Sequence, residues 1–140
     1  MEWPVFIIER HHIDYWVDLC AEEFGTYGDI DRLKKMLYTM ADQQILLAFD
    51  GDGTGLFCYI ISDDFKGNDI FSEVLFIIRK ENRGSLKLVK QYINKAEELA
   101  RENNCLSIKI GGNIGYKDDG FIKLLKRWGY VDDTVSKKVG

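Results

Sequence analysis

Apolar residues recur at helical spacing in four segments of the chain, which predict four helices. The segments are residues 12–24, the stretch after Asp29, the stretch between Gly84 and Asn103, and residues 121–128. Asp29 is a suitable N-cap for the second helix, and Gly129 is suited to end the last one. The clearest apolar stripe, in the third helix, consists of Leu86, Val89, Ile93, Ala96 and Ala100.

Short apolar, β-branched runs between these segments predict strands. We expect them at residues 5–8, 44–49, 56–61, about 70–78, 105–110 and 134–139. Residues 50–55, with the sequence Asp-Gly-Asp-Gly-Thr-Gly, predict a hairpin turn. The helix between the strands at 70–78 and 105–110 implies one right-handed parallel crossover. The pattern therefore predicts a single α/β domain over residues 1–140, with a mixed, mostly antiparallel central sheet and helices on both faces.

Composition places a local basic site on an acidic chain. The 140 residues carry a net charge of −4, whereas the segment from Arg79 to Lys90 has five basic residues and one acidic residue, a net of +4. The rest of the chain must then carry −8, which argues against a general nucleic-acid surface. Three scattered cysteines favour free thiols in a reducing cytoplasm, and no apolar run is long enough for a membrane span.

The basic segment lies where a buried strand leads through a glycine-bearing turn into a helix. Free backbone N–H groups and the helix dipole favour an anion at such a position. Each cation near a helix N-terminus costs about 0.3–1 kcal/mol, so this accumulation indicates a phosphorylated ligand. The alternative is a solvated basic turn without a ligand.

The sequence of this turn resembles the GNAT (Gcn5-related N-acetyltransferase) family. Residues 83–88, Arg-Gly-Ser-Leu-Lys-Leu, resemble the family pattern Arg/Gln-x-x-Gly-x-Gly/Ala, with Leu86 and Leu88 in place of its glycines. Residues 80–85 resemble small phage-type acetyltransferase-like proteins. Residues 124–130 resemble the family helix that ends in Tyr-x-Lys-x-Gly-Phe, but Leu125 occupies the position where many members have a general-acid tyrosine. The resemblance implies an acyl-CoA N-acyltransferase-like fold.

The resemblance also implies an activity: acetyl-CoA-dependent transfer of an acetyl group directly to an amine. The acceptor would be an amine-bearing small molecule or a protein lysine, and the acidic body favours a cationic one. A homodimer through the C-terminal strand is also implied. The alternative is a catalytically inactive, phage-encoded binding or inhibitor protein that keeps the fold. The residues expected at the acetyl-CoA site are Ile77, Ile78, Arg79, Arg83, Gly84, Ser85, Leu86, Lys87, Leu88 and Asn113.

Three residues are candidates for acid–base chemistry. Glu73 could remove the amine proton, because the family often has a glutamate near this position; alternatively, it is a solvent-facing strand-end residue in a surface ion pair. Tyr116 and Tyr130 could replace the missing acid at Leu125, although a tyrosine that follows Gly129 could instead serve packing.

No metal site is expected from the two motifs that suggest one. His11 and His12 fit a surface pair at a helix start better than a ligand pair. The acidic turn at residues 50–53 lacks the glutamate that a calcium loop needs at its twelfth position, which is Ile61 here.

Overall fold

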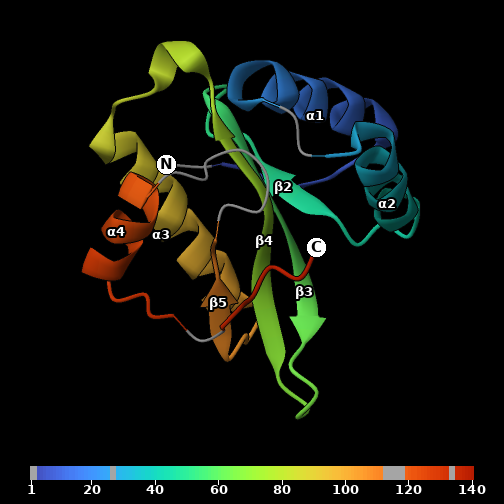
Figure 1. Cartoon of the computed structure of the whole chain (residues 1–140). Helices are drawn as coiled ribbons and strands as arrows, with labels where there is room; N and C mark the ends of the chain where they lie inside the picture. The colour runs from blue at the N-terminus through green and yellow to red at the C-terminus, as the bar shows by residue number, and fades with distance from the viewer. Residues whose placement is uncertain (1–2, 26–27, 112–118, 133–134) are drawn as a thin grey trace.

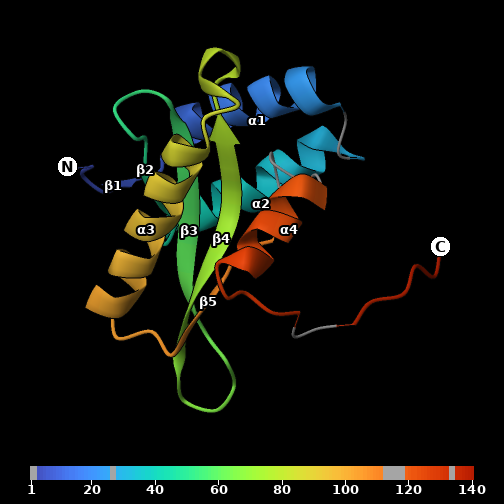
Figure 2. The same ribbon diagram turned by 90° about the vertical axis from the view of Figure 1, so that its left-hand side faces the viewer.

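A five-stranded sheet lies between two layers of helices (Figures 1 and 2). The computed structural model describes residues 3–25, 28–111, 119–132 and 135–140. In chain order the elements are β1 (Phe6–Ile7), α1 (Arg10–Phe24), α2 (Ile30–Asp42), β2 (Leu47–Phe49), β3 (Gly55–Asp63), β4 (Asp69–Ile78), the short 3-10 helix η1 (Lys80–Asn82), α3 (Leu86–Glu102), β5 (Ser107–Lys109) and α4 (Asp119–Arg127).

The strands follow one another across the sheet in the order β1-β2-β3-β4-β5. The first four are antiparallel neighbours, and β4 and β5 are parallel and joined through α3. This confirms the predicted mixed, mostly antiparallel sheet with helices on both faces.

Each face of the sheet carries its own core. On one face, α1 and α2 bury Val17, Cys20 and Leu37 against the sheet. On the other, α3 and α4 cover aromatic residues of the sheet, and Tyr92 and Phe121 contribute from the helices. Complete burial of one large apolar side chain contributes about 1.5–3 kcal/mol, so both helix layers are fixed firmly to the sheet.

A β-bulge interrupts the β3–β4 pairing. Cys58 faces Leu75, but its neighbour Tyr59 faces Glu73, so Val74 is an extra residue in β4. Leu75 and Val74 both pack against the α1–α2 core. The bulge therefore turns Glu73 toward the other face, which carries α3 and α4.

The structure differs from the sequence predictions mainly near the C-terminus. The strand expected at residues 134–139 is wrong, because residues 135–140 form no strand. Val135 and Val139 are 100% and 92% exposed, and a segment with two isolated valines buries too little apolar surface to offset its ordering entropy. The strand expected at 105–110 shortens to β5, and the three cysteines remain free thiols. None of the described helices combines the length and hydropathy that a membrane crossing requires.

Candidate functional site

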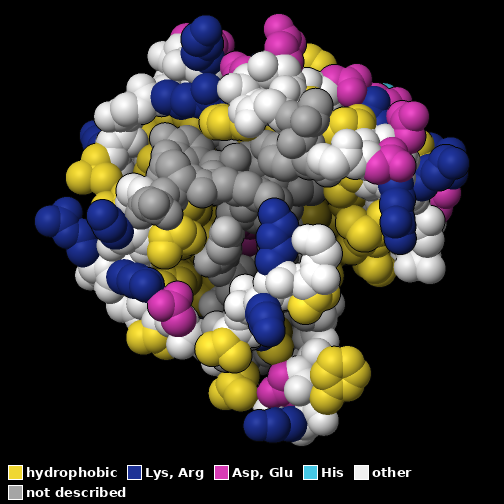
Figure 3. All heavy atoms as spheres, viewed as in Figure 1, with side chains coloured by type: hydrophobic (Ala, Val, Ile, Leu, Met, Phe, Trp, Pro, Cys, Tyr) yellow, Lys and Arg dark blue, Asp and Glu magenta, His cyan; other side chains and the backbone are white. Residues whose placement is uncertain are grey.

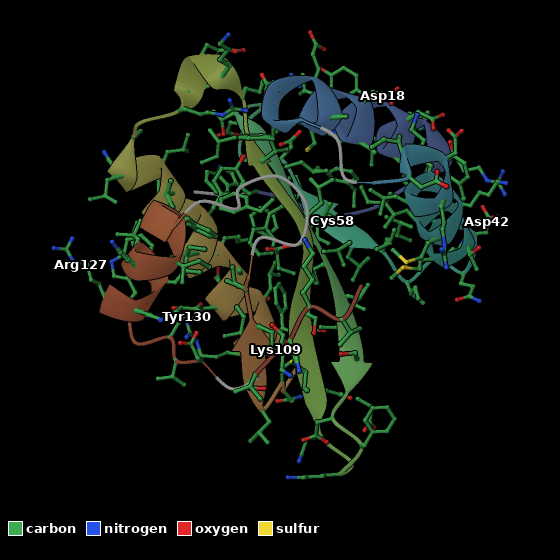
Figure 4. The ribbon with its side chains drawn as sticks, viewed as in Figure 1. Asp18, Asp42, Cys58, Lys109, Arg127 and Tyr130 are labelled. Atoms are coloured by element: carbon green, nitrogen blue, oxygen red, sulfur yellow. The ribbon has the colours of Figure 1, made fainter. Side chains whose placement is uncertain are left out.

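β4 and β5 run side by side only over the first part of β4. The last parallel pair is Ser72 with Lys109, whereas β4 continues to Ile78. Where the two strands part, a cavity of about 390 Å³ opens beside α4. Figure 4 labels two of its lining residues, Lys109 on β5 and Tyr130 after α4. The full lining consists of Ser72, Glu73, Ile108, Lys109, Ile110, Gly111, Ile122, Leu125, Lys126, Tyr130, Val131 and Asp132.

Glu73 lines this cavity although its side chain is buried, with 2% of its surface exposed. The interpretation of Glu73 as a solvent-facing strand-end residue is therefore wrong. Burial, and second the nearby Glu73 carboxylate, raise the pKa of the Cys58 thiol on β3. A carboxylate held inside a cavity, next to a strand bulge, is suited to accept a proton from a bound molecule.

A second hollow lies at the start of α3. It has a volume of about 240 Å³ and separates the first turn of α3 from α4. Gly84 adopts a φ of +90°, and Ser85 caps the helix by accepting the Leu88 N–H at 3.1 Å. The hollow is lined by Gly84, Ser85, Leu86, Val89, Gly120, Phe121 and Leu124.

The N–H groups of Leu86 and Lys87 at this hollow have no acceptor within the helix, because they belong to its first turn. The N–H of Leu88, which is also expected at the acetyl-CoA site, donates to the Ser85 hydroxyl in this structure. The two leucines that replace the family glycines differ in position. Leu86 is 58% exposed, whereas Leu88 packs against the α3–α4 core.

The two arginines of the basic turn contact α1 and neighbouring loops. Arg79 donates from Nε to the Gly53 carbonyl at 2.9 Å and from Nη1 to the Tyr15 hydroxyl at 2.7 Å. Its guanidinium carbon also lies 4.7 Å from the centre of the Trp16 ring.

Arg83 donates from Nε to the Ile78 carbonyl at 2.9 Å and pairs through Nη2 with the Glu23 carboxylate. Its guanidinium carbon lies 4.4 Å from the centre of the Phe24 ring. The Arg83 and Glu23 side chains are 22% and 14% exposed, so this pair is largely shielded from water. No sequence pattern pointed to Glu23.

The remaining cations of this region are lysines. Lys80 and Lys87 are exposed, and the Lys90 ammonium lies 4.2 Å from the centre of the Trp128 ring, just after the end of α4. Ile77 and Ile78, also predicted at this site, are buried in the cores on opposite faces of β4.

Tyr130 lines the large cavity, but its hydroxyl donates to Glu97 on α3 at 2.8 Å. Burial, and then this bond, raise the pKa of the Tyr130 hydroxyl. Leu125, at the position of the family tyrosine, also lines the cavity and is 2% exposed. Asn113 and Tyr116 lie outside the described residues.

The two motifs that suggested a metal have structural roles. The Glu9 N–H donates to Nδ1 of His12 at the start of α1, and residues 50–53 connect β2 to β3. Within the described ranges, no group of three or more potential metal ligands occurs.

Comparisons with known proteins connect this arrangement to a family through structure alone. No family model and no curated protein matches the sequence. Among solved structures, a GCN5-related N-acetyltransferase from Ralstonia eutropha JMP134 is similar with a TM-score of 0.71 and 10% identity, covering 99% of this chain and 98% of that one. A predicted acetyltransferase with acetyl-CoA from Clostridium acetobutylicum is similar with a TM-score of 0.68 and 10% identity, covering 99% of this chain and 96% of that one. A GNAT family acetyltransferase from Staphylococcus aureus subsp. aureus USA300_TCH1516 is similar with a TM-score of 0.60 and 19% identity, covering 100% of this chain and 99% of that one. The chain therefore has the fold of the GNAT acetyltransferases.

Proposed function

We propose that this GNAT-fold chain is an N-acetyltransferase that takes an acetyl group from acetyl-CoA and transfers it directly to the amine of a small molecule or a protein. The observation that carries the proposal is the buried Glu73 carboxylate in the cavity where β4 and β5 part. Fold alone does not establish an activity, so this site has to support the reaction.

The hollow at the start of α3 fits the diphosphate of acetyl-CoA. The first-turn N–H groups of Leu86 and Lys87 and the positive end of the helix dipole favour an anion there. Lys87 is exposed beside them, and Lys123 and Arg127 are exposed on α4. Lys and Arg side chains are frequent along the left edge of Figure 3, on the side of α3 and α4. Val89, Phe121 and Leu124 give the hollow an apolar wall.

Glu73 would act as the general base. An amine attacks a carbonyl only in its neutral form, so a carboxylate that takes its proton, directly or through water, promotes the reaction. Bound acetyl-CoA would supply the acetyl group as a thioester. The bulge at Val74 takes backbone out of the regular ladder next to Glu73, where an N–H can stabilise negative charge on an oxygen.

The proton donor is the part of the site that departs from the family. Leu125 has no proton to give, and the Tyr130 hydroxyl would have to leave Glu97 before it could act as an acid. The chemistry supported by the described residues is therefore that of a base with main-chain stabilisation.

The experiment that tests the proposal combines acetyl-CoA binding with thiol release in the presence of a panel of amines. Glu73→Gln keeps the shape of the side chain and should lower kcat by roughly 10²- to 10⁴-fold while leaving the Kd for acetyl-CoA unchanged. Asp132→Asn is the matched control, because Asp132 is another carboxylate of the same cavity but pairs with Lys126 at 2.8 Å.

Three outcomes are distinct. Loss of turnover in Glu73→Gln alone supports the proposal. Full turnover in that variant would remove Glu73 from the mechanism. Absence of acetyl-CoA binding at millimolar concentration would reject the cofactor and leave the binding-protein alternative.

A further inference from the structure

We propose that Glu23 is a positioning residue for the acetyl-CoA site, and that Arg83 acts through Glu23 instead of contacting the phosphates. The inference rests on the proposed function, because it concerns how the diphosphate site at the start of α3 is held in place. Nothing in the sequence pattern assigned a role to Glu23.

The contacts of Arg83 direct its guanidinium toward the end of β4 and α1. Nε is used by the Ile78 carbonyl, Nη2 by Glu23, and Phe24 lies against the planar group. These partners belong to the end of β4 and the last turn of α1. The hollow at the start of α3 is lined instead by residues of α3, α4 and the preceding turn. Neither Arg83 nor Lys87 is among them, but the Lys87 side chain is exposed and, unlike Arg83, has no ion pair with α1 among the described residues.

The position of Glu23 in α1 also indicates that its ion pair with Arg83 is important. A carboxylate in the last turn of a helix meets the negative end of the helix dipole, which is unfavourable. Pairing with Arg83 offsets this effect, and the low exposure of both side chains limits screening by salt. The pair therefore fixes the turn that carries Gly84 and Ser85 against the end of α1.

Arg79, like Arg83, holds the turn in place and does not point to a role in ligand contact. Its contacts with Tyr15 and Trp16 fasten the end of β4 to α1 a second time. The ligand would then meet the N–H groups of Leu86 and Lys87 and the exposed Lys87 ammonium. Lys87, and not Arg83, would supply the countercharge for the diphosphate.

The test measures the Kd for coenzyme A by calorimetry at low and high sodium chloride. The variants are Glu23→Gln, Arg83→Gln, their double variant and Lys87→Gln. Glu22→Gln is the matched control, since Glu22 is adjacent and exposed. Salt screens a direct ammonium–phosphate contact at an exposed site much more than it screens a shielded pair, so the salt dependence distinguishes contact from positioning.

We expect Glu23→Gln and Arg83→Gln to weaken binding to a similar extent, about 3- to 10-fold, the equivalent of about one net hydrogen bond. The double variant should bind coenzyme A no more weakly than the weaker-binding of the two single variants. In all three of these variants the salt dependence of the Kd should remain that of the wild type. Lys87→Gln should weaken binding and flatten the salt dependence, and Glu22→Gln should change neither.

Unchanged or tighter binding in Glu23→Gln, with weaker binding and a flatter salt dependence in Arg83→Gln, would overturn the inference by showing that Arg83 contacts the phosphates. Failure of the wild type to bind coenzyme A would overturn the proposed function as well. If Glu23→Gln does not fold, Glu23→Asp keeps the charge and withdraws it by one methylene, and the same weakening is expected.

Discussion

The N-cap of α3 offers a single perturbation that reports on both stability and ligand position. In Ser85→Ala the Leu88 N–H loses its acceptor at 3.1 Å, and nothing else in the described structure is removed. Loss of one such cap costs about 1 kcal/mol. With an unfolding entropy of about 2.1 cal/mol/K per residue, a chain of 140 residues changes by about 0.29 kcal/mol/K, so Tm should fall by about 3 °C.

The same variant should respond differently once coenzyme A is bound. A phosphate at the start of α3 can accept the N–H that Ser85→Ala frees, so the difference in Tm between the wild type and the variant should narrow when ligand is added. Asp29→Ala is the matched control: Asp29 caps α2 by accepting the Arg32 N–H at 3.0 Å, and α2 is not part of the proposed diphosphate site. Its loss of Tm should be the same with and without ligand.

Thermal unfolding of the three proteins, each with and without saturating coenzyme A, is the assay. If the difference in Tm between the wild type and Ser85→Ala is the same with and without ligand, as in the control, phosphate binding at the α3 N-terminus is refuted. If ligand makes this difference in Tm larger, the Ser85 hydroxyl binds the ligand itself, which would refute its assignment as a cap in the complex. No loss of Tm without ligand would refute the magnitude assigned to the cap.

Two further predictions concern stability. Burial, and then His11, lower the pKa of His12 below its ordinary 6.5, and Nδ1 must stay unprotonated to accept the Glu9 N–H. The unfolded chain therefore binds the proton first, so the free energy of unfolding in urea should fall as pH drops from about 6.5 toward the lower folded-state pKa, and His12→Gln should lose this dependence. Tyr92→Phe should lower the free energy of unfolding in urea by about 1 kcal/mol, because the buried hydroxyl no longer donates to the Asp50 carbonyl at 2.8 Å; an unchanged urea midpoint would contradict that contact.

The sequence predicts the parts of the fold that depend on local pattern. The apolar stripe of α3 from Val89 onward, the glycine turn before it and the hairpin at residues 50–55 are all read from neighbouring residues, and the structure confirms them. Leu86, the first residue of the predicted stripe, is instead exposed, because it lies in the first turn of the helix. The two helix layers and the single parallel crossover follow from the order of these elements. The strand predicted at residues 134–139 is wrong because a strand needs a neighbouring strand to pair with, and the composition of a segment does not show whether one is available.

The site was harder to predict because its geometry depends on pairings between distant segments. Whether Glu73 faces solvent or a cavity depends on the bulge at Val74, which only the register of two strands reveals. The Arg83 side chain is directed by Glu23, 60 residues away in the sequence. The basic composition of the turn drew attention to this region, but it could not show which cations are already paired.

The N–H groups at the start of α3 have a consequence for how much sequence change this fold accepts. They belong to the main chain, so a helix that begins at this point presents them whatever side chains follow, even leucines in place of glycines. A helix start of this kind therefore depends on the backbone path more than on residue identity. The same architecture can then persist while most of the sequence changes, which is consistent with solved structures that share this fold at 10% to 19% identity.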